Sequence, residues 1–317
     1  MLEKHELHKI KNKFRDYLLK INIDPMKPQD FDLFLVYPET NGIPELLDQL
    51  DDLKKCLDSF RPIDPIHLKK LEKVWDIVYT YDSNRIEGNT LTLQETALVI
   101  EKGLTVKGKP LKDHIETINH KEALDYIKNI VETKIPFTEE ILLTIHRIIL
   151  QSIDRSNAGL YRQDRVRIQG SQHICPNPLK VPELMKSYFM FYQNNKNKLH
   201  PVILAADMHQ KLENIHPFID GNGRTARLIM NLILLQNGFP IASISSKERD
   251  KYYDTLELAH VQGDIVEFQR MIIIEVKNSL FEFLKMISTP KEDDKGSYFY
   301  SKIAPYIEKE ITEEGYL

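Results

Sequence analysis

Residues 216–227 read His-Pro-Phe-Ile-Asp-Gly-Asn-Gly-Arg-Thr-Ala-Arg and lie between two segments with helical periodicity, 201–215 and 222–236. Gly221 and Gly223 let backbone N–H groups converge on an anion. The start of the second helix directs its unpaired amides and the positive end of its dipole to the same place. The stretch therefore predicts a phosphate-binding loop at a helix N-terminus.

The side chains around this loop suit nucleotide chemistry. Asn222 adds a side-chain donor, while Arg224 and Arg227 share a helical face and lean back toward the loop, where both could hold a polyphosphate. Asp220 supplies a hard oxygen for Mg²⁺, which normally takes one or two carboxylates together with phosphate and water oxygens. His216 offers an imidazole, the side chain most often used to take a proton from an attacking hydroxyl. This combination predicts transfer of a nucleotidyl group.

The rest of the chain predicts an all-α fold. Apolar residues recur at three- and four-residue spacing, and prolines near helix starts and glycines near helix ends agree with that periodicity. The expected helices are 44–60, 65–82, 92–102, 111–132, 138–151, 181–194, 201–215, 222–236, 246–261 and 264–287.

Residues 160–180 break the helical pattern. Val166 and Ile168 alternate with Arg165 and Arg167 ahead of a Gly-Ser turn. Alternation of this kind, bounded by turn residues, predicts a short β-hairpin.

Composition excludes several classes of protein. The 43 basic and 47 acidic residues give a formal charge of -4, so no overall basic field favours nucleic acid. The two cysteines, Cys56 and Cys175, argue against a disulfide framework or a cysteine zinc site. The longest apolar runs fall short of the roughly 20 residues that cross a bilayer. We therefore expect a soluble, cytoplasmic protein without membrane association.

Eight positions of residues 216–227 match the pattern H-x-F-x-[DE]-G-N-G-R-x-x-R, and in this the chain resembles Fic-domain proteins. The segments HPVILAADMHQKLENI and RDKYYDTLELAHVQGD are also similar to that family, so the resemblance spans roughly residues 70–285. It implies a helical Fic fold and roles for the motif residues: His216 as general base, Asp220 as Mg²⁺ ligand, Gly221, Asn222, Gly223 and Arg224 as phosphate binders, and Arg227 as the residue that holds the terminal phosphate.

The same resemblance suggests a base pocket and a flap. Tyr252, Tyr253 and His260 lie in the segment where the family builds its adenine pocket. The predicted hairpin is similar to the family's flap, whose edge positions a target segment by strand addition. It implies that Val166, Arg167 and Ile168 position the target.

Residues 83–88 read Ser-Asn-Arg-Ile-Glu-Gly and resemble the inhibitory motif [ST]-x-x-x-E-[GN] of many Fic proteins. Ser83 and Glu87 are four apart and share a helical face, and Gly88 is expected to end the helix just past the carboxylate. The resemblance implies that Glu87 pairs with Arg227 and blocks productive placement of ATP.

We therefore predict an N-terminal helical extension over 1–70, an inhibitory helix segment over 71–105, a Fic catalytic domain over 106–287 with the small hairpin flap, and a tail over 288–317 with one possible helix. The predicted reaction moves AMP from ATP, with Mg²⁺, to a Tyr, Thr or Ser hydroxyl of a target protein. Removal of AMP, transfer of another phosphate-linked group and nucleotide sensing without catalysis remain alternatives, and a homo-oligomer remains open.

Overall fold

The computed structural model describes residues 42–59, 61 and 65–287, and within those ranges every regular element is a helix. This confirms the all-α fold class. The residues divide into two compact units, and all residues of the predicted site lie in the unit formed by residues 72–279. The predicted domain boundaries stay predictions.

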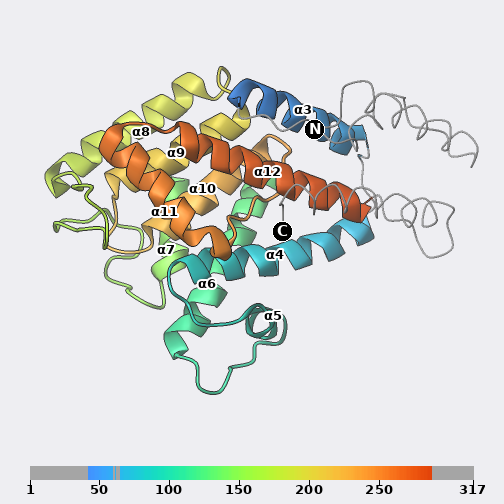
Figure 1. Cartoon of the computed structure of the whole chain (residues 1–317). Helices are drawn as coiled ribbons and strands as arrows, with labels where there is room; N and C mark the ends of the chain where they lie inside the picture. Colours follow the sequence, from blue (N-terminus) through green and yellow to red (C-terminus); the bar gives the residue numbers. More distant parts are fainter. Residues whose placement is uncertain (1–41, 60, 62–64, 288–317) are drawn as a thin grey trace, which may run out of the picture. The chain divides into compact units, whose positions relative to one another are not determined.

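Figure 1 shows the order of the helices along the chain. They are α3 (Ile43–Ser59), α4 (Pro65–Ile86), α5 (Leu93–Lys102), α6 (Leu111–Glu132), α7 (Glu139–Leu150), α8 (Val181–Asn195), α9 (Pro201–Ile215), α10 (Asn222–Gln236), α11 (Arg249–Glu257) and α12 (Val266–Ile287). Short 3₁₀ turns occupy Pro178–Lys180 and Ser246–Glu248, and a π-helical turn, Leu258–Gln262, follows α11.

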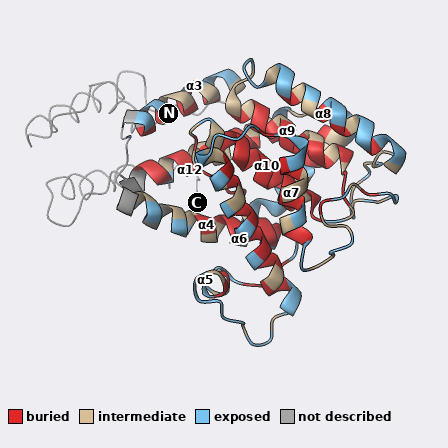
Figure 2. Ribbon diagram, turned by 180° about the vertical axis from the view of Figure 1, so that it is seen from behind, coloured by how far each residue is buried: buried red, intermediate tan, exposed pale blue. Residues whose placement is uncertain are grey.

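Helix α10 forms the centre of the core. Its residues from Arg224 to Leu234 are all buried, and α9, α6 and α7 pack against it. Figure 2 shows α9 and α10 buried along most of their length. Each fully buried leucine, isoleucine or methionine contributes about 1.5–3 kcal/mol relative to an exposed one. The phosphate-binding loop is therefore attached to one of the most firmly packed helices of the protein.

The predicted helix ends agree with the structure at most positions. Gly103 ends α5 with φ of 62°, and Gly238, just after α10, has φ of 76°. Helix α4 is four residues longer than predicted, because Ser83, Asn84 and Ile86 are buried and make tertiary contacts that continue the helix. The predicted helix 246–261 is divided into a 3₁₀ turn, α11 and the π-helical turn.

The predicted β-hairpin is not confirmed. Residues 160–177 contain turns and irregular backbone and no strand, so Val166, Arg167 and Ile168 do not form a paired edge. Polar groups of this segment find partners outside a strand ladder. Arg162 donates to the carbonyls of His216 and Pro176, for example, at 2.7 Å each.

Other predictions fall outside the described residues. These are the first 41 residues of the predicted N-terminal helical extension and the tail over 288–317. Among the helices that the structure describes, none is both long and apolar enough to cross a bilayer.

Candidate active site

The loop before α10 is held in shape by hydrogen bonds of the Asn222 side chain. Gly221, with φ of 77°, is the N-cap residue of α10. Asn222 is buried, and its side chain both accepts from the amide of Phe218 and donates to the carbonyl of Phe218, each at 3.0 Å. Asn222 therefore shapes the loop with both side-chain groups, and one of its two amide N–H groups is already engaged.

A histidine absent from the predictions supports this loop from behind. The ring of His146 on α7 stacks on Phe218 with centroids 3.6 Å apart and planes 10° apart. Its Nδ1 accepts from the amide of Gly159 at 3.0 Å, and its Nε2 donates to the carbonyl of Asp220 at 2.9 Å. Burial lowers the pKa of His146 to about 4. The neutral ring thus fixes the backbone just before the phosphate-binding amides.

His216 lies at the junction of α9 and the loop. It caps α9 in the left-handed region, with φ of 50° and ψ of 60°. Its carbonyl accepts from Nε of the buried Arg162 at 2.7 Å. Its Nδ1 lies 3.6 Å from a carboxylate oxygen of Glu213, one turn earlier on α9. Burial acts to raise the pKa of Glu213, but the nearby His216 lowers it, so this carboxylate remains charged beside the imidazole. The backbone of His216 is thus held by Arg162, and a carboxylate lies close to the imidazole.

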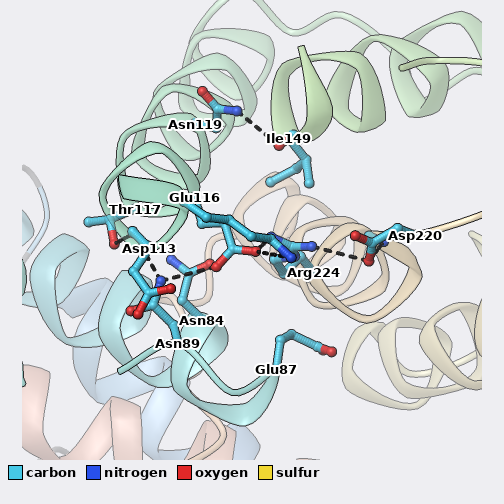
Figure 3. A network of polar contacts seen from close by, with 12 residues as sticks. Asn84, Glu87, Asn89, Asp113, Glu116, Thr117, Asn119, Ile149, Asp220 and Arg224 are labelled. Carbon is cyan, nitrogen blue, oxygen red and sulfur yellow. Dashed lines mark hydrogen bonds and ion pairs between the residues drawn. The ribbon is translucent and has the colours of Figure 1, made fainter. Parts of the chain in front are cut away.

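Arg224 lies between two carboxylates, as Figure 3 shows. Its Nη1 lies 3.1 Å from Oε1 of Glu116 on α6, and its Nη2 lies 3.3 Å from Oδ1 of Asp220. The other oxygen of Glu116 accepts from the side-chain amide of Asn89 at 3.1 Å. The guanidinium is 3% exposed, so its direction is set by these partners.

Asp220 is the carboxylate open to a metal ion. Its Oδ1 accepts from the amide of Gly221 at 2.6 Å, and its side chain is 50% exposed. Among the described residues no three histidine, cysteine or carboxylate side chains gather closely enough to hold a metal by themselves. A Mg²⁺ ion on Asp220 would therefore need phosphate oxygens and water to complete its shell.

Glu87 occupies the position where we expected an anion. Its Oε1 accepts from Nη2 of Arg227 at 2.7 Å, and a methyl group added at Gly223 would collide with that same oxygen. The carboxylate therefore lies directly on the first turn of α10. Arg227 is 1% exposed, and although burial acts to lower its pKa, Tyr252 and Glu87 raise it above its ordinary value. The structure confirms the pairing of Glu87 with Arg227.

Two further residues, Ser83 and Tyr252, bind Arg227. Ser83 accepts twice, with its hydroxyl from Nε at 3.0 Å and with its carbonyl from Nη2 at 2.8 Å. The Tyr252 hydroxyl accepts from Nη1 at 3.2 Å. Arg224 and Arg227 thus bind different carboxylates, Arg224 those of Glu116 and Asp220 and Arg227 that of Glu87.

The three candidates for the base pocket differ in their surroundings. Tyr252 is 1% exposed and its hydroxyl is bound to Arg227, so the structure gives it no free surface for a base. Tyr253 is half-buried, and its hydroxyl donates to the carbonyl of Ile86 at 3.3 Å. Burial raises the pKa of Tyr253 to about 12. His260 lies in the π-helical turn with its ring centroid 4.9 Å from that of His173.

The irregular segment 160–177, which we call the flap, is bound both to α11 and to the end of α9. Glu257, at the end of α11, accepts from the Ser171 hydroxyl and, at 2.7 Å, from the amide of Gln172. Nε2 of His173 donates to the carbonyl of Asn214 at 2.8 Å, near the end of α9. The contact made by His173 brings the flap to the end of α9 that carries His216.

Comparison with known proteins agrees with this geometry. Residues 136–234 match the Fic/DOC family. This chain belongs to the Fic/DOC family. It is similar to Protein adenylyltransferase Fic from Drosophila grimshawi, with 34% identity over 253 residues, 78% of this chain and 52% of the fly protein. The Drosophila melanogaster protein of the same name is 37% identical over 236 residues, 72% of this chain and 47% of the relative. The chain therefore spans about half the length of the curated Fic relatives that it matches.

Solved Fic structures share the fold. A Fic domain containing signaling protein from Bacteroides thetaiotaomicron superposes with a TM-score of 0.70 and 29% identity, covering 79% of this chain and 99% of the other. Fic-1 from C. elegans gives a TM-score of 0.70 and 29% identity, with 78% and 73% covered.

Sequence reasoning missed several residues of this Fic site. His146, Arg162, Glu116, Glu213 and His209 each contact a predicted site residue or its immediate support. In the sequence, the one feature that could have marked these residues is an ionisable side chain within a segment that is otherwise assigned a structural role. That signal does not show which distant residue is the partner.

Proposed function

We propose that this chain is a protein adenylyltransferase, which moves AMP from ATP to a Tyr, Thr or Ser hydroxyl of a target protein. The observation that carries the proposal is the convergence of His216, Asp220, Arg224 and Arg227 on one loop at the start of α10. The names of the Fic relatives support it. ATP is then the substrate, and Mg²⁺ the ion that Asp220 would hold.

The proposed reaction assigns one task to each group. His216 takes the proton of the attacking hydroxyl, whose oxygen forms a bond to the α-phosphorus while the bond to pyrophosphate breaks. Amides at the start of α10 and the Arg224 guanidinium stabilise the charge on the phosphates. Mg²⁺ on Asp220 would neutralise phosphate charge. Arg227 would hold the terminal phosphate, which directs the α-phosphorus toward His216.

We further propose that Glu87 inhibits this reaction. Its carboxylate is bound to Arg227 and lies against Gly223, so a terminal phosphate at the same arginine must displace it. A nucleotide that binds without displacing Glu87 is held with its α-phosphate out of line, and no transfer follows.

The test uses the purified chain, Mg²⁺ and ATP labelled either at the α- or at the γ-phosphate, with a lysate as the source of targets. Label from the α-position on protein, and a mass increase of one AMP in the chain itself, support the proposal. Label from the γ-position would instead indicate phosphoryl transfer.

Two further arms separate the alternatives. Loss of AMP from protein that has been modified beforehand, dependent on Glu87, would indicate the reverse hydrolytic activity. Binding of ATP with no product, in the wild type and in Glu87→Gly alike, would favour a nucleotide sensor. Gel filtration with light scattering tests whether the chain forms a homo-oligomer.

A further inference from the structure

We propose that Tyr252, backed by His209, is a positioning residue for Arg227, and that this pair sets how strongly the site prefers a nucleoside triphosphate over a diphosphate. The inference rests on the proposed function, since it takes Arg227 as the group that holds the terminal phosphate. It removes Tyr252 from the base pocket, where the sequence had placed it.

The contacts of Arg227 fall into two sets. Glu87 makes one hydrogen bond to Nη2, and it is the partner that a phosphate replaces. Ser83 and Tyr252 make the others, to Nε, Nη2 and Nη1. The second set remains when Glu87 leaves. Tyr252 is the partner of Nη1, so among these contacts it alone holds the guanidinium on the side that Ser83 does not bind.

The direction of the hydrogen bonds follows from the chemistry of the groups. A guanidinium has donors only, so the Tyr252 oxygen must accept from Arg227. The hydroxyl proton is then free to be donated to Nε2 of His209, 3.0 Å away. We assign the lone pair to that nitrogen, which makes His209 the neutral Nδ1–H tautomer, with its buried Nδ1 unpaired among the described residues. Burial lowers the pKa of His209 to about 3, in agreement with a neutral ring.

Packing keeps the chain of contacts in place. His209 is fully buried, and its ring centroid lies 5.0 Å from Phe268 and 5.7 Å from Tyr252. The hydroxyl of Thr255 donates to the carbonyl of Tyr252 at 2.9 Å, which fixes the backbone at that position. Neither ring can turn without displacing core side chains, so the acceptor stays in place for Nη1 whether or not Glu87 is bound.

Such a fixed acceptor matters for the terminal phosphate. Without it, Nη1 would lose its hydrogen bond, and the guanidinium would be held only along the edge that Ser83 binds, about which it could tilt. A phosphate then has to order the arginine as it binds, which weakens binding. The α- and β-phosphates, which bind the loop amides and Arg224, do not need this arrangement. Loss of the Tyr252 hydroxyl should therefore weaken ATP and spare ADP.

The experiment measures ATP and ADP dissociation constants by calorimetry with Mg²⁺ present, all in the Glu87→Gly background so that Arg227 is available. Tyr252→Phe removes the hydroxyl and keeps the ring. One lost hydrogen bond to a charged group should weaken ATP by about 5- to 30-fold, with ADP changed less than about 2-fold. An equal loss for both nucleotides, or no loss, overturns the proposal.

Three further variants serve as controls. Tyr253→Phe removes the neighbouring hydroxyl, which binds the carbonyl of Ile86, and any effect should be equal for ATP and ADP. His209→Gln retains an acceptor for the Tyr252 proton, whereas His209→Leu removes it. The leucine variant should reproduce the selective loss of ATP, and the glutamine variant should restore part of it.

The outcome also separates this inference from the proposed function. If the Glu87→Gly protein binds neither nucleotide, the adenylyltransferase proposal fails. If it binds both, and the ratio of their dissociation constants is the same in Tyr252→Phe, the positioning role alone is refuted.

Discussion

Replacement of Glu87 by glycine tests the proposed inhibitory contact most directly. The Glu87 carboxylate binds Arg227 at 2.7 Å, with the arginine 1% and the glutamate 30% exposed. A hydrogen bond between charged groups contributes about 1.5–3 kcal/mol, and we take about 1.5–2 because the carboxylate is partly hydrated. A terminal phosphate must overcome this contact to reach Arg227.

The expected gain follows from that energy. At 1.4 kcal/mol per factor of ten, Glu87→Gly should strengthen productive ATP binding by about 10- to 30-fold. Correct alignment of the α-phosphate adds to the rate, since positioning alone is worth several kcal/mol of barrier. AMP incorporation into the chain itself, followed with labelled ATP, should therefore rise by more than the affinity.

Stability gives a second, independent measurement. Without ATP, Glu87→Gly leaves the buried Arg227 with hydrogen bonds to the neutral groups of Ser83 and Tyr252, at a cost of about 1–3 kcal/mol in the free energy of unfolding. Adding ATP supplies a negative partner. The variant should thus melt below the wild type alone and gain more from ATP.

Two controls sharpen the result. Glu87→Gln keeps the shape and one hydrogen bond but loses the charge, so it should be activated less than the glycine variant. Adding Arg227→Ala to Glu87→Gly should abolish activity again. Equal ATP affinity and equal AMP incorporation in the wild type and Glu87→Gly, with folding confirmed, would refute the inhibitory contact.

The remaining predictions concern the base, the metal ion and pH. His216→Ala should lower transfer by about 10²–10⁴-fold while the ATP dissociation constant changes little, and turnover at the wild-type level would exclude His216 as the base. Asp220→Ala should shift the Mg²⁺ titration of ATP binding to higher concentration, and superimposable titration curves would rule out this ligand. The buried His146 has a pKa of about 4 against 6.5 for an ordinary histidine, so the unfolded chain binds more protons between those values. Its contribution to stability should therefore be complete above pH 6.5 and fall by up to about 1.4 kcal/mol per pH unit as pH drops toward 4. His146→Gln, which keeps a donor for the Asp220 carbonyl, should make denaturant midpoints less dependent on pH over that range.

Local features of the site were predictable from sequence because their geometry is local. The loop before α10, the helix end at Gly88 and the placement of His216 each depend on residues within a turn or two of one another. Helix periodicity likewise gave most helix bounds to within one or two residues. The pairing of Glu87 with Arg227 was different, since only the resemblance to a known family indicated it.

Partners that are distant in sequence were not predictable. Glu116 and Arg224 are 108 positions apart, and nothing in the spacing of either marks them as a pair. Tyr252 and Tyr253 looked equivalent as neighbours on a helix, yet one is inside the core and the other half-buried. The hairpin failed for a related reason: alternation indicates a strand only where another strand pairs with it. Here the Glu257 side chain of α11 and the Arg162 side chain of the segment itself bind its backbone.

Glu87 follows Ile86, the last residue of α4, and belongs to the turn that Gly88 completes with φ of 97°. Its side chain can swing away while Ser83, inside the helix, continues to hold Arg227. Rotation of an exposed side chain takes picoseconds to nanoseconds. Even slowed a millionfold, it would match or outpace typical turnover of about 1–10³ per second. The protein should therefore exchange rapidly between a form with Glu87 bound to Arg227 and a less populated form without that contact, and only the second form should transfer AMP. A mutation or a bound partner that changes the energy of this turn by a kilocalorie or two per mole should then change the basal rate by degrees.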